Sequence, residues 1–113
     1  MNKRLFALLP MALIMSITAQ SAFASFWSGS KLFQWLEQDL RGQASYEQGA
    51  AIGYIVGVSD FGDGVLFCMP SGATVGQVKQ VVYNYMQKHP EAWDKSADFS
   101  IAAALQATWK CAK

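Results

Sequence analysis

The residues best suited to chemistry in this chain are Cys68, Cys111 and a single histidine, His89. A catalytic thiolate needs a base within hydrogen-bonding reach, and Cys68 with His89 is the one pair that the sequence offers for this role. The competing interpretation is a disulfide between Cys68 and Cys111, because two cysteines in an exported protein are most simply paired. We favour the disulfide, which leaves no thiolate for catalysis.

The remaining polar residues do not form a recognisable metal or hydrolase site. Zinc sites draw most of their ligands from His, Cys and carboxylate side chains, and this chain has one histidine. Glu91, Asp94 and Asp98 lie close together in sequence, but their position fits the solvated start of a helix. His89, next to Pro90, fits a helix end. We therefore predict no enzyme, no metal and no cofactor, and a binding role instead.

The first 24 residues have the three parts of a secretory signal peptide. Lys3 and Arg4 give a positive start, residues 5–17 are mostly apolar, and residues 22–24 form the A-x-A triplet that precedes a cleavage site. A retained membrane anchor is the alternative, but the apolar run contains a proline and is shorter than the roughly 20 residues that span a bilayer. We expect cleavage to release residues 25–113 into the periplasm, free of the membrane.

Composition makes the mature chain a small, nearly neutral single domain. The full sequence has nine Lys or Arg and eight Asp or Glu residues, and removal of Lys3 and Arg4 leaves a net charge close to −1. A nucleic-acid or anionic-membrane binder would show a basic cluster, which this sequence lacks. So short a domain buries a modest core, and a disulfide from Cys68 to Cys111 would add about 4 kcal/mol of stability.

Hydrophobic periodicity predicts four helices with short connections and a single turn that starts at Pro90. The expected helix caps are Ser30, Ser45, Thr74, and either Asp94 or Ser96. The second and third caps also start capping boxes, in which a glutamine three residues later bonds back. The apolar stripes comprise Leu32, Phe33, Leu36 and Leu40, then Val78, Val81, Val82, Tyr85 and Met86, then Ala97, Ile101, Ala104 and Leu105. We therefore predict an all-α fold, a small irregular bundle of four to five helices with one disulfide.

The predicted second helix contains Gly49, Gly53 and Gly57 at intervals of four residues. At this spacing the glycines share one face of the helix and leave a smooth groove along it. Each helix-interior glycine costs about 1 kcal/mol relative to alanine, so we expect another helix backbone to pack closely along this groove. The other residues are apolar around much of the circumference, which predicts burial on most sides.

The segment that ends this helix and follows it is the predicted partner-binding site. Gly62 and Gly64 mark a turn, and apolar side chains lie beside it. The loop either covers the core or projects toward another protein, since binding residues concentrate on loops held by a rigid scaffold. Asp60 likewise either accepts hydrogen bonds from the following turn or contacts a partner. The candidate partner-binding residues are Asp60, Phe61, Asp63, Val65, Leu66 and Phe67.

A set of short motifs occurs in a fixed order from about Gly49 to the end of the chain. Each motif alone is weak, but their order and spacing together are specific. The motifs are Tyr54-Ile-Val-Gly-Val-Ser-Asp60, Cys68-Met-Pro70, Gly72-Ala-Thr74, Val81-Val-x-x-Tyr85, His89-Pro-Glu91, Ser96-Ala97 and Ala104-Leu105, ahead of Cys111. This set resembles the Rap/Tai family of immunity proteins against type VI secretion amidases.

The resemblance implies a periplasmic, all-helical, disulfide-bridged immunity domain over residues 25–113, often a homodimer. Its partner would be a peptidoglycan amidase delivered by neighbouring bacteria. Inhibition would proceed by occlusion, with a protruding loop and the adjoining helix surface entering the groove of the amidase. A rigid projection suits this role because little ordering entropy is lost on binding.

Two other functions compete with this interpretation. The chain is similar in size and bridge count to the small periplasmic acid-stress chaperones, which open at low pH and expose apolar surface. It has one histidine and few acids to drive such opening. A structural subunit of an envelope complex is neither supported nor refuted by the sequence. An immunity protein is therefore the leading hypothesis.

Overall fold

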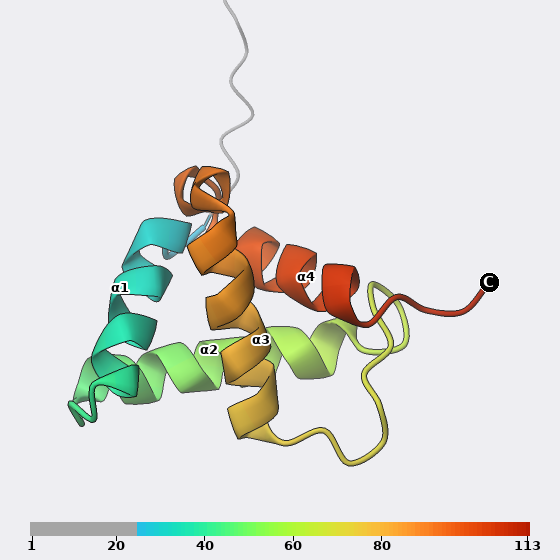
Figure 1. Ribbon diagram of the computed structural model, residues 1–113, viewed down its shortest axis with the longest axis horizontal. Helices are drawn as coiled ribbons and strands as arrows, with labels where there is room; N and C mark the ends of the chain where they lie inside the picture. The colour runs from blue at the N-terminus through green and yellow to red at the C-terminus, as the bar shows by residue number, and fades with distance from the viewer. Residues whose placement is uncertain (1–24) are drawn as a thin grey trace, which may run out of the picture.

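The fold is built from short helices whose ends coincide with polar caps and glycines. A computed structural model describes residues 25–113 and contains α1 Gly29–Leu40, α2 Tyr46–Gly62, α3 Val75–Lys88, the short 3-10 helix η1 Pro90–Asp94, and α4 Ala97–Thr108 (Figure 1). Within this range the extended pairing is limited to two isolated bridges. The predicted all-α class is confirmed, whereas the predicted signal peptide lies outside the described residues.

The capping box predicted at Thr74 is confirmed, and the one predicted at Ser45 is wrong. The Thr74 hydroxyl accepts from the Gln77 N–H at 3.2 Å, and the Gln77 side chain accepts from the Thr74 N–H at 2.9 Å. Ser45 does cap α2 by position, but its hydroxyl donates to Glu47. Gln48 is buried and donates to a glutamine of α1 at 3.1 Å. The Gln48 side chain is therefore engaged with α1 and does not complete the capping box.

The first helix begins earlier than predicted, because Ser28 and not Ser30 is its cap. The Ser28 hydroxyl accepts from the backbone N–H of Lys31 at 3.2 Å, which satisfies one of the free amides of the first turn. Ser28 is extended and forms an isolated antiparallel bridge with Ser96. The chain therefore changes from extended to helical at this residue.

This bridge belongs to a short strap that holds the N-terminal segment against the start of α4. The Gly29 N–H donates to the Lys95 carbonyl at 2.7 Å, and the Ala97 N–H donates to the Trp27 carbonyl at 2.9 Å. A Cβ atom on Gly29 would lie 2.3 Å from the Ala92 carbonyl oxygen, so only glycine permits this close approach. Residues 25–28 are thereby positioned beside α4.

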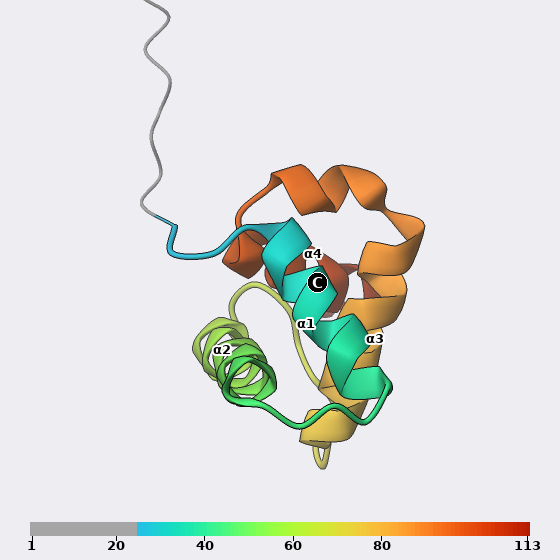
Figure 2. The same ribbon diagram turned by 90° about the vertical axis from the view of Figure 1, so that its left-hand side faces the viewer.

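The core forms where all four helices contact one another. Figure 2 views α2 nearly end-on and shows it at one side of the domain, with the other helices packed against one flank. Leu40, expected in the core, is 44% exposed because it lies in the last turn of α1. The buried core residues are Leu32, Phe33, Leu36, Ala51, Ile55, Phe67, Val78, Val82, Met86, Ala97, Ile101, Ala104 and Leu105.

The spaced glycines of α2 do not pack against another helix, so that prediction is wrong. A Cβ atom placed on Gly49, Gly53 or Gly57 meets no atom outside the local helix backbone within 4 Å, and all three residues are exposed. The buried face of α2 is instead the stripe Gln48, Ala51, Ile55, Ser59 and Gly62. Burial on most sides is therefore also wrong, because the glycine face points away from the core.

Replacement of Gly53 by alanine is expected to stabilise the protein. The new methyl group has open space, and alanine restricts the unfolded chain, so the free energy of unfolding should rise by about 1 kcal/mol. Gly62→Ala is the contrasting variant, because its Cβ atom would lie 2.7 Å from the Phe67 ring. We expect it to lose about 1–3 kcal/mol. Urea unfolding followed by circular dichroism measures both, and a loss of stability in Gly53→Ala would contradict the open glycine face.

Candidate functional site

The end of α2 and the turn after it form a projection that we call the ridge, residues 60–66. The backbone N–H groups of Val65 and Leu66 both donate to the Gly62 carbonyl, at 3.1 and 2.8 Å. Gly64 has a φ of +79°, a left-handed conformation that glycine adopts without strain. Its N–H donates to the carbonyl three residues later at 2.8 Å. The turn is therefore closed by its own hydrogen bonds.

Asp63 fastens this turn to the chain that follows. One carboxylate oxygen of Asp63 accepts from the backbone N–H of Met69 at 2.8 Å. The sequence allowed the same role for Asp60, but within the described residues no hydrogen bond joins the Asp60 side chain to the turn. Asp60 is exposed in the last turn of α2. It is left available to a partner.

The far end of the turn is anchored in the core and to the C-terminal segment. Phe67 is fully buried, and its ring packs against Gly62 at the end of α2. The next residue, Cys68, donates its N–H to the Trp109 carbonyl at 2.8 Å. Its side chain forms the predicted disulfide with Cys111, with 4.8 Å between the Cα atoms. Covalent, polar and apolar contacts therefore all converge on two adjacent residues.

The structure separates the six predicted partner-binding residues into two groups. Phe67 has no exposed surface, so it supports the ridge from below and is not available for contact. Phe61 is 85% exposed, Val65 is 79% exposed, and Leu66 is about half exposed. The residues that a partner can reach are Asp60, Phe61, Asp63, Val65 and Leu66. Their role as contacts stays a prediction.

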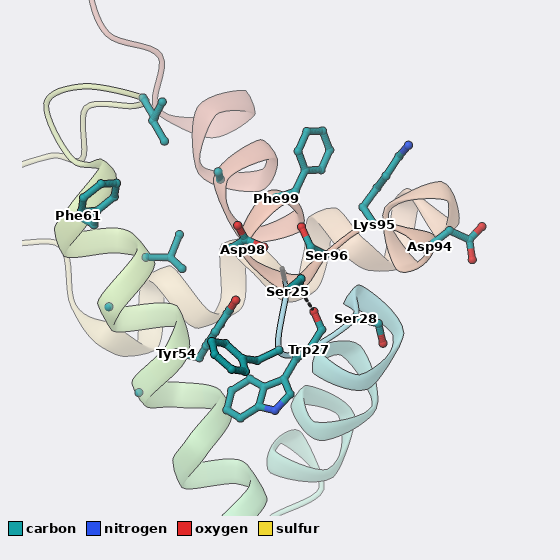
Figure 3. A pocket seen from close by; sticks show the side chains of 16 residues that line it. Ser25, Trp27, Ser28, Tyr54, Phe61, Asp94, Lys95, Ser96, Asp98 and Phe99 are labelled. Carbon is teal, nitrogen blue, oxygen red and sulfur yellow. Dashed lines mark hydrogen bonds between the residues drawn. The ribbon is translucent and has the colours of Figure 1, made fainter. Parts of the chain in front are cut away.

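Beside the ridge, a groove of about 1390 Å³ lies between α2, the start of α4 and the N-terminal segment (Figure 3). Gly53 and Gly57 belong to its α2 side, so the groove follows the open glycine face. Phe61 and Leu66 of the ridge also line it, and Phe99 faces it from α4. Figure 3 shows Phe61 and Phe99 on opposite sides of the groove. Apolar side chains from distant parts of the chain are thereby brought together.

The groove also carries charged groups. Asp94, Lys95 and Asp98 line it, and Figure 3 shows Asp98 near its middle, with Lys95 and Asp94 farther from Phe61. Tyr54 lies near Asp98 and packs on Trp27, with 4.8 Å between the ring centroids. Burial, followed by the negative charge of Asp98, raises the pKa of the Tyr54 hydroxyl. This hydroxyl therefore stays protonated and can serve as a hydrogen-bond donor.

A second hollow, of about 500 Å³, lies on another side of the ridge. Val65 and Leu66 line it together with residues of α3, α4 and the C-terminal segment, including Lys110 and Cys111. Leu66 lines both hollows. The ridge therefore stands between two recesses.

Cys68 is joined to Cys111, so it does not supply the thiolate that a catalytic pair with His89 would need. His89 caps the end of α3 as predicted, with its Nδ1 atom 2.9 Å from Glu91 Oε1 and its ring stacked on Tyr85. A backbone hydrogen bond and then the contact with His89 lower the pKa of the Glu91 carboxyl. Within residues 25–113 no group of three or more His, Cys, Asp or Glu side chains could hold a metal ion. The helices of this part are also too short or too polar to cross a membrane.

Sequence reasoning missed the groove, although it found the ridge. Tyr54, Phe99 and Asp98 were not predicted as site residues, and Trp27 was not connected with them. One signal was available: Phe99 lies in the first turn of α4 but off the predicted apolar stripe of that helix. An aromatic residue off the buried stripe marks an exposed apolar position.

The chain matches a known family. The family model described as "Rap1a immunity proteins" matches residues 28–111. A comparison with curated proteins gives no match. The matched range contains all four helices, the ridge and both cysteines.

Loss of the disulfide is expected to destabilise the protein strongly. The bridge closes a loop with a sequence separation of 43, for which the chain-entropy estimate is about 4 kcal/mol. A variant with both Cys68→Ser and Cys111→Ser should therefore unfold at much lower denaturant concentration than the oxidised protein. Wild-type protein treated with a thiol reductant is the matched control and should behave like the variant. Equal midpoints for the oxidised protein and the variant would contradict this account.

Proposed function

This chain belongs to the Rap1a immunity proteins, and we propose that it protects the cell that makes it by binding a secreted effector protein and covering its active surface. The observation that carries the proposal is the family match, which extends over every helix of the domain. Such a role requires no catalytic group in the immunity protein. It requires a surface complementary to the effector.

The ridge is the surface best suited to enter a cleft of the effector. Its exposed apolar side chains, Phe61, Val65 and Leu66, lie on a turn that is already ordered by hydrogen bonds. The disulfide and the buried Phe67 hold the base of this turn in place. Binding therefore costs little additional ordering, which favours high affinity from a small contact area.

We further propose that the effector is a peptidoglycan amidase and that binding takes place in the periplasm. The amidase is supported by the resemblance to the Rap/Tai family, whose members act against such enzymes. The periplasm is supported by the signal-peptide pattern of the first 24 residues and by the disulfide, because the periplasm keeps paired cysteines oxidised.

The same resemblance supports a homodimer as the functional unit. We expect the purified protein to sediment with about twice the mass of the mature chain at micromolar concentration. Analytical ultracentrifugation measures this directly, over a range of protein concentrations. A monomer mass throughout that range would remove the dimer from the proposal, while leaving effector binding open to the test below.

Shortening Phe61 or Val65 is expected to weaken effector binding without affecting the fold. Both side chains are exposed, so Phe61→Ala and Val65→Ala should each leave the free energy of unfolding nearly unchanged. A central apolar contact of an interface is worth about 2 kcal/mol, so the dissociation constant should rise about 30-fold. Calorimetry with the purified product of any secreted hydrolase gene found next to this gene measures the change, and a cell-lysis assay measures protection.

Tyr46→Ala provides a matched control for Phe61→Ala. Tyr46 is equally exposed and lies at the opposite end of α2, so its removal should leave binding intact. Equal losses in the two variants would show that the ridge is not the contact surface. If the wild-type protein neither binds nor neutralises the neighbouring hydrolase, the proposed function is wrong.

A further inference from the structure

We propose that the groove between α2 and α4 is the surface through which two copies of this chain associate, and that α2 of one copy crosses α2 of the other at Gly57. This inference rests on the homodimer of the proposed function, because it assigns the dimer an interface. The groove of each copy would then cover the groove of the other, as the two-fold symmetry of most homodimers requires.

The groove gathers exposed phenylalanines from separate parts of the chain. Phe26 is 93% exposed, Phe61 is 85% exposed and Phe99 is 56% exposed, and all three line it. An aromatic side chain that becomes fully buried removes about 150–250 Å² from water, so these rings expose on the order of 400 Å² per copy. Two facing grooves would bury about twice this area through the rings alone. A specific interface buries about 1,200–2,000 Å² in total, so the rings supply a large share of it.

Such an apolar surface needs an occupant that is always present. An immunity protein has to remain soluble before any effector arrives, and a contiguous group of exposed apolar side chains promotes association with other proteins. An effector would cover the groove only during an attack. A second copy of the chain is present at all times, so it is the occupant that keeps the phenylalanines covered.

The glycine face allows the two α2 helices to approach closely. At Gly53 and Gly57 a Cβ atom would meet nothing within 4 Å beyond the local helix backbone, so no side chain holds a second helix away. The α2 residues that line the groove run from Gly53 to Phe61, and Gly57 is their midpoint. Helices that pack along rows of residues four apart cross at about 50°, which confines their contact to the neighbourhood of the crossing.

The charges of the groove are self-complementary in the mature chain. Asp94 and Asp98 line it with two carboxylates, and Lys95 lines it with one ammonium group. Ser25 also lines it and would carry the N-terminal ammonium group after signal cleavage. Within residues 25–113 none of the three charged side chains takes part in an ion pair. A second groove presents equal numbers of both signs, so the interface gains no net repulsion and each group can meet an opposite charge.

Association through the groove leaves one flank of the ridge open to the effector. Asp60, Asp63 and Val65 do not line the groove, whereas Phe61 and Leu66 form the edge that the groove shares with the ridge. We therefore expect Val65→Ala to weaken effector binding and to leave the dimer intact. Phe61→Ala is expected to weaken both, so it does not separate the two contacts.

A leucine at the crossing tests the interface directly. Gly57→Leu should raise the dissociation constant of the dimer about 30-fold, the scale of a central interface contact, because its side chain separates the two backbones. Gly76→Leu is the matched control, since Gly76 is also an exposed helical glycine but lies in α3, outside the groove. Analytical ultracentrifugation measures the dimer. Urea unfolding at dilutions where wild type is monomeric confirms that each subunit is folded.

A cysteine at the crossing gives a positive test. The two native cysteines are paired, so Gly57→Cys supplies the one free thiol of residues 25–113. A disulfide can form where two Cα atoms come within about 7 Å. Under mild oxidation Gly57→Cys should therefore run as a covalent dimer on a non-reducing gel, and Gly76→Cys should run mainly as a monomer.

The outcomes separate this inference from the proposed function. If Gly57→Leu dimerises like wild type, or if Gly57→Cys forms no more covalent dimer than Gly76→Cys, the interface lies elsewhere and the inference is wrong while the dimer stands. A wild-type protein that is monomeric throughout removes both. If Gly57→Leu instead weakens calorimetric binding of a secreted hydrolase by a monomeric wild type, the occupant is the effector and the inference is wrong. Effector binding by wild type stands or fails separately.

Discussion

The organisation of this molecule depends on the attachment of the turn after α2 to the end of α4. Phe67 fills the core, Cys68 pairs covalently with Cys111, and the Cys68 N–H bonds to the Trp109 carbonyl. These contacts join segments that are far apart in the chain, and they hold in one position the turn that exposes Val65 and Leu66. A domain of this size has a limited core, so a covalent link supplies rigidity that packing alone would not.

The two faces of α2 differ in what they contribute to the domain. Ala51 and Ile55 face the core and contribute to stability. The glycine face is exposed, lowers helix propensity and makes no packing contact inside the domain that would offset this cost. Natural proteins tolerate such local costs most readily where a surface serves another purpose. The open face of α2, the ridge at its C-terminal end and the groove beside it therefore form one continuous region.

Local features of the sequence predicted local structure well. The Thr74 capping box, the apolar stripe of α3 and the disulfide each follow from residues whose partners are near in sequence or unique in the chain. The box at Ser45 failed because tertiary packing drew Gln48 toward α1. Periodicity showed that the glycines share a face but not which way the face points. Phe67 resembled its apolar neighbours in sequence, so only the folded structure distinguishes it as buried. The groove joins residues 25–28, 53–61, 66 and 94–102, which are separated in the chain and meet only on folding.

The strap that fixes residues 25–28 against α4 affects how this protein can be handled in the laboratory. Ser25 lines the groove, so a purification tag attached there begins at the rim of the groove. The opposite terminus follows Cys111 and emerges near the ridge (Figure 1). Immobilisation through either end would therefore place the attachment beside the groove or the ridge. The exposed connection between α1 and α2, residues 41–45, lies away from both surfaces and is the better point for coupling to a sensor chip or a fluorophore.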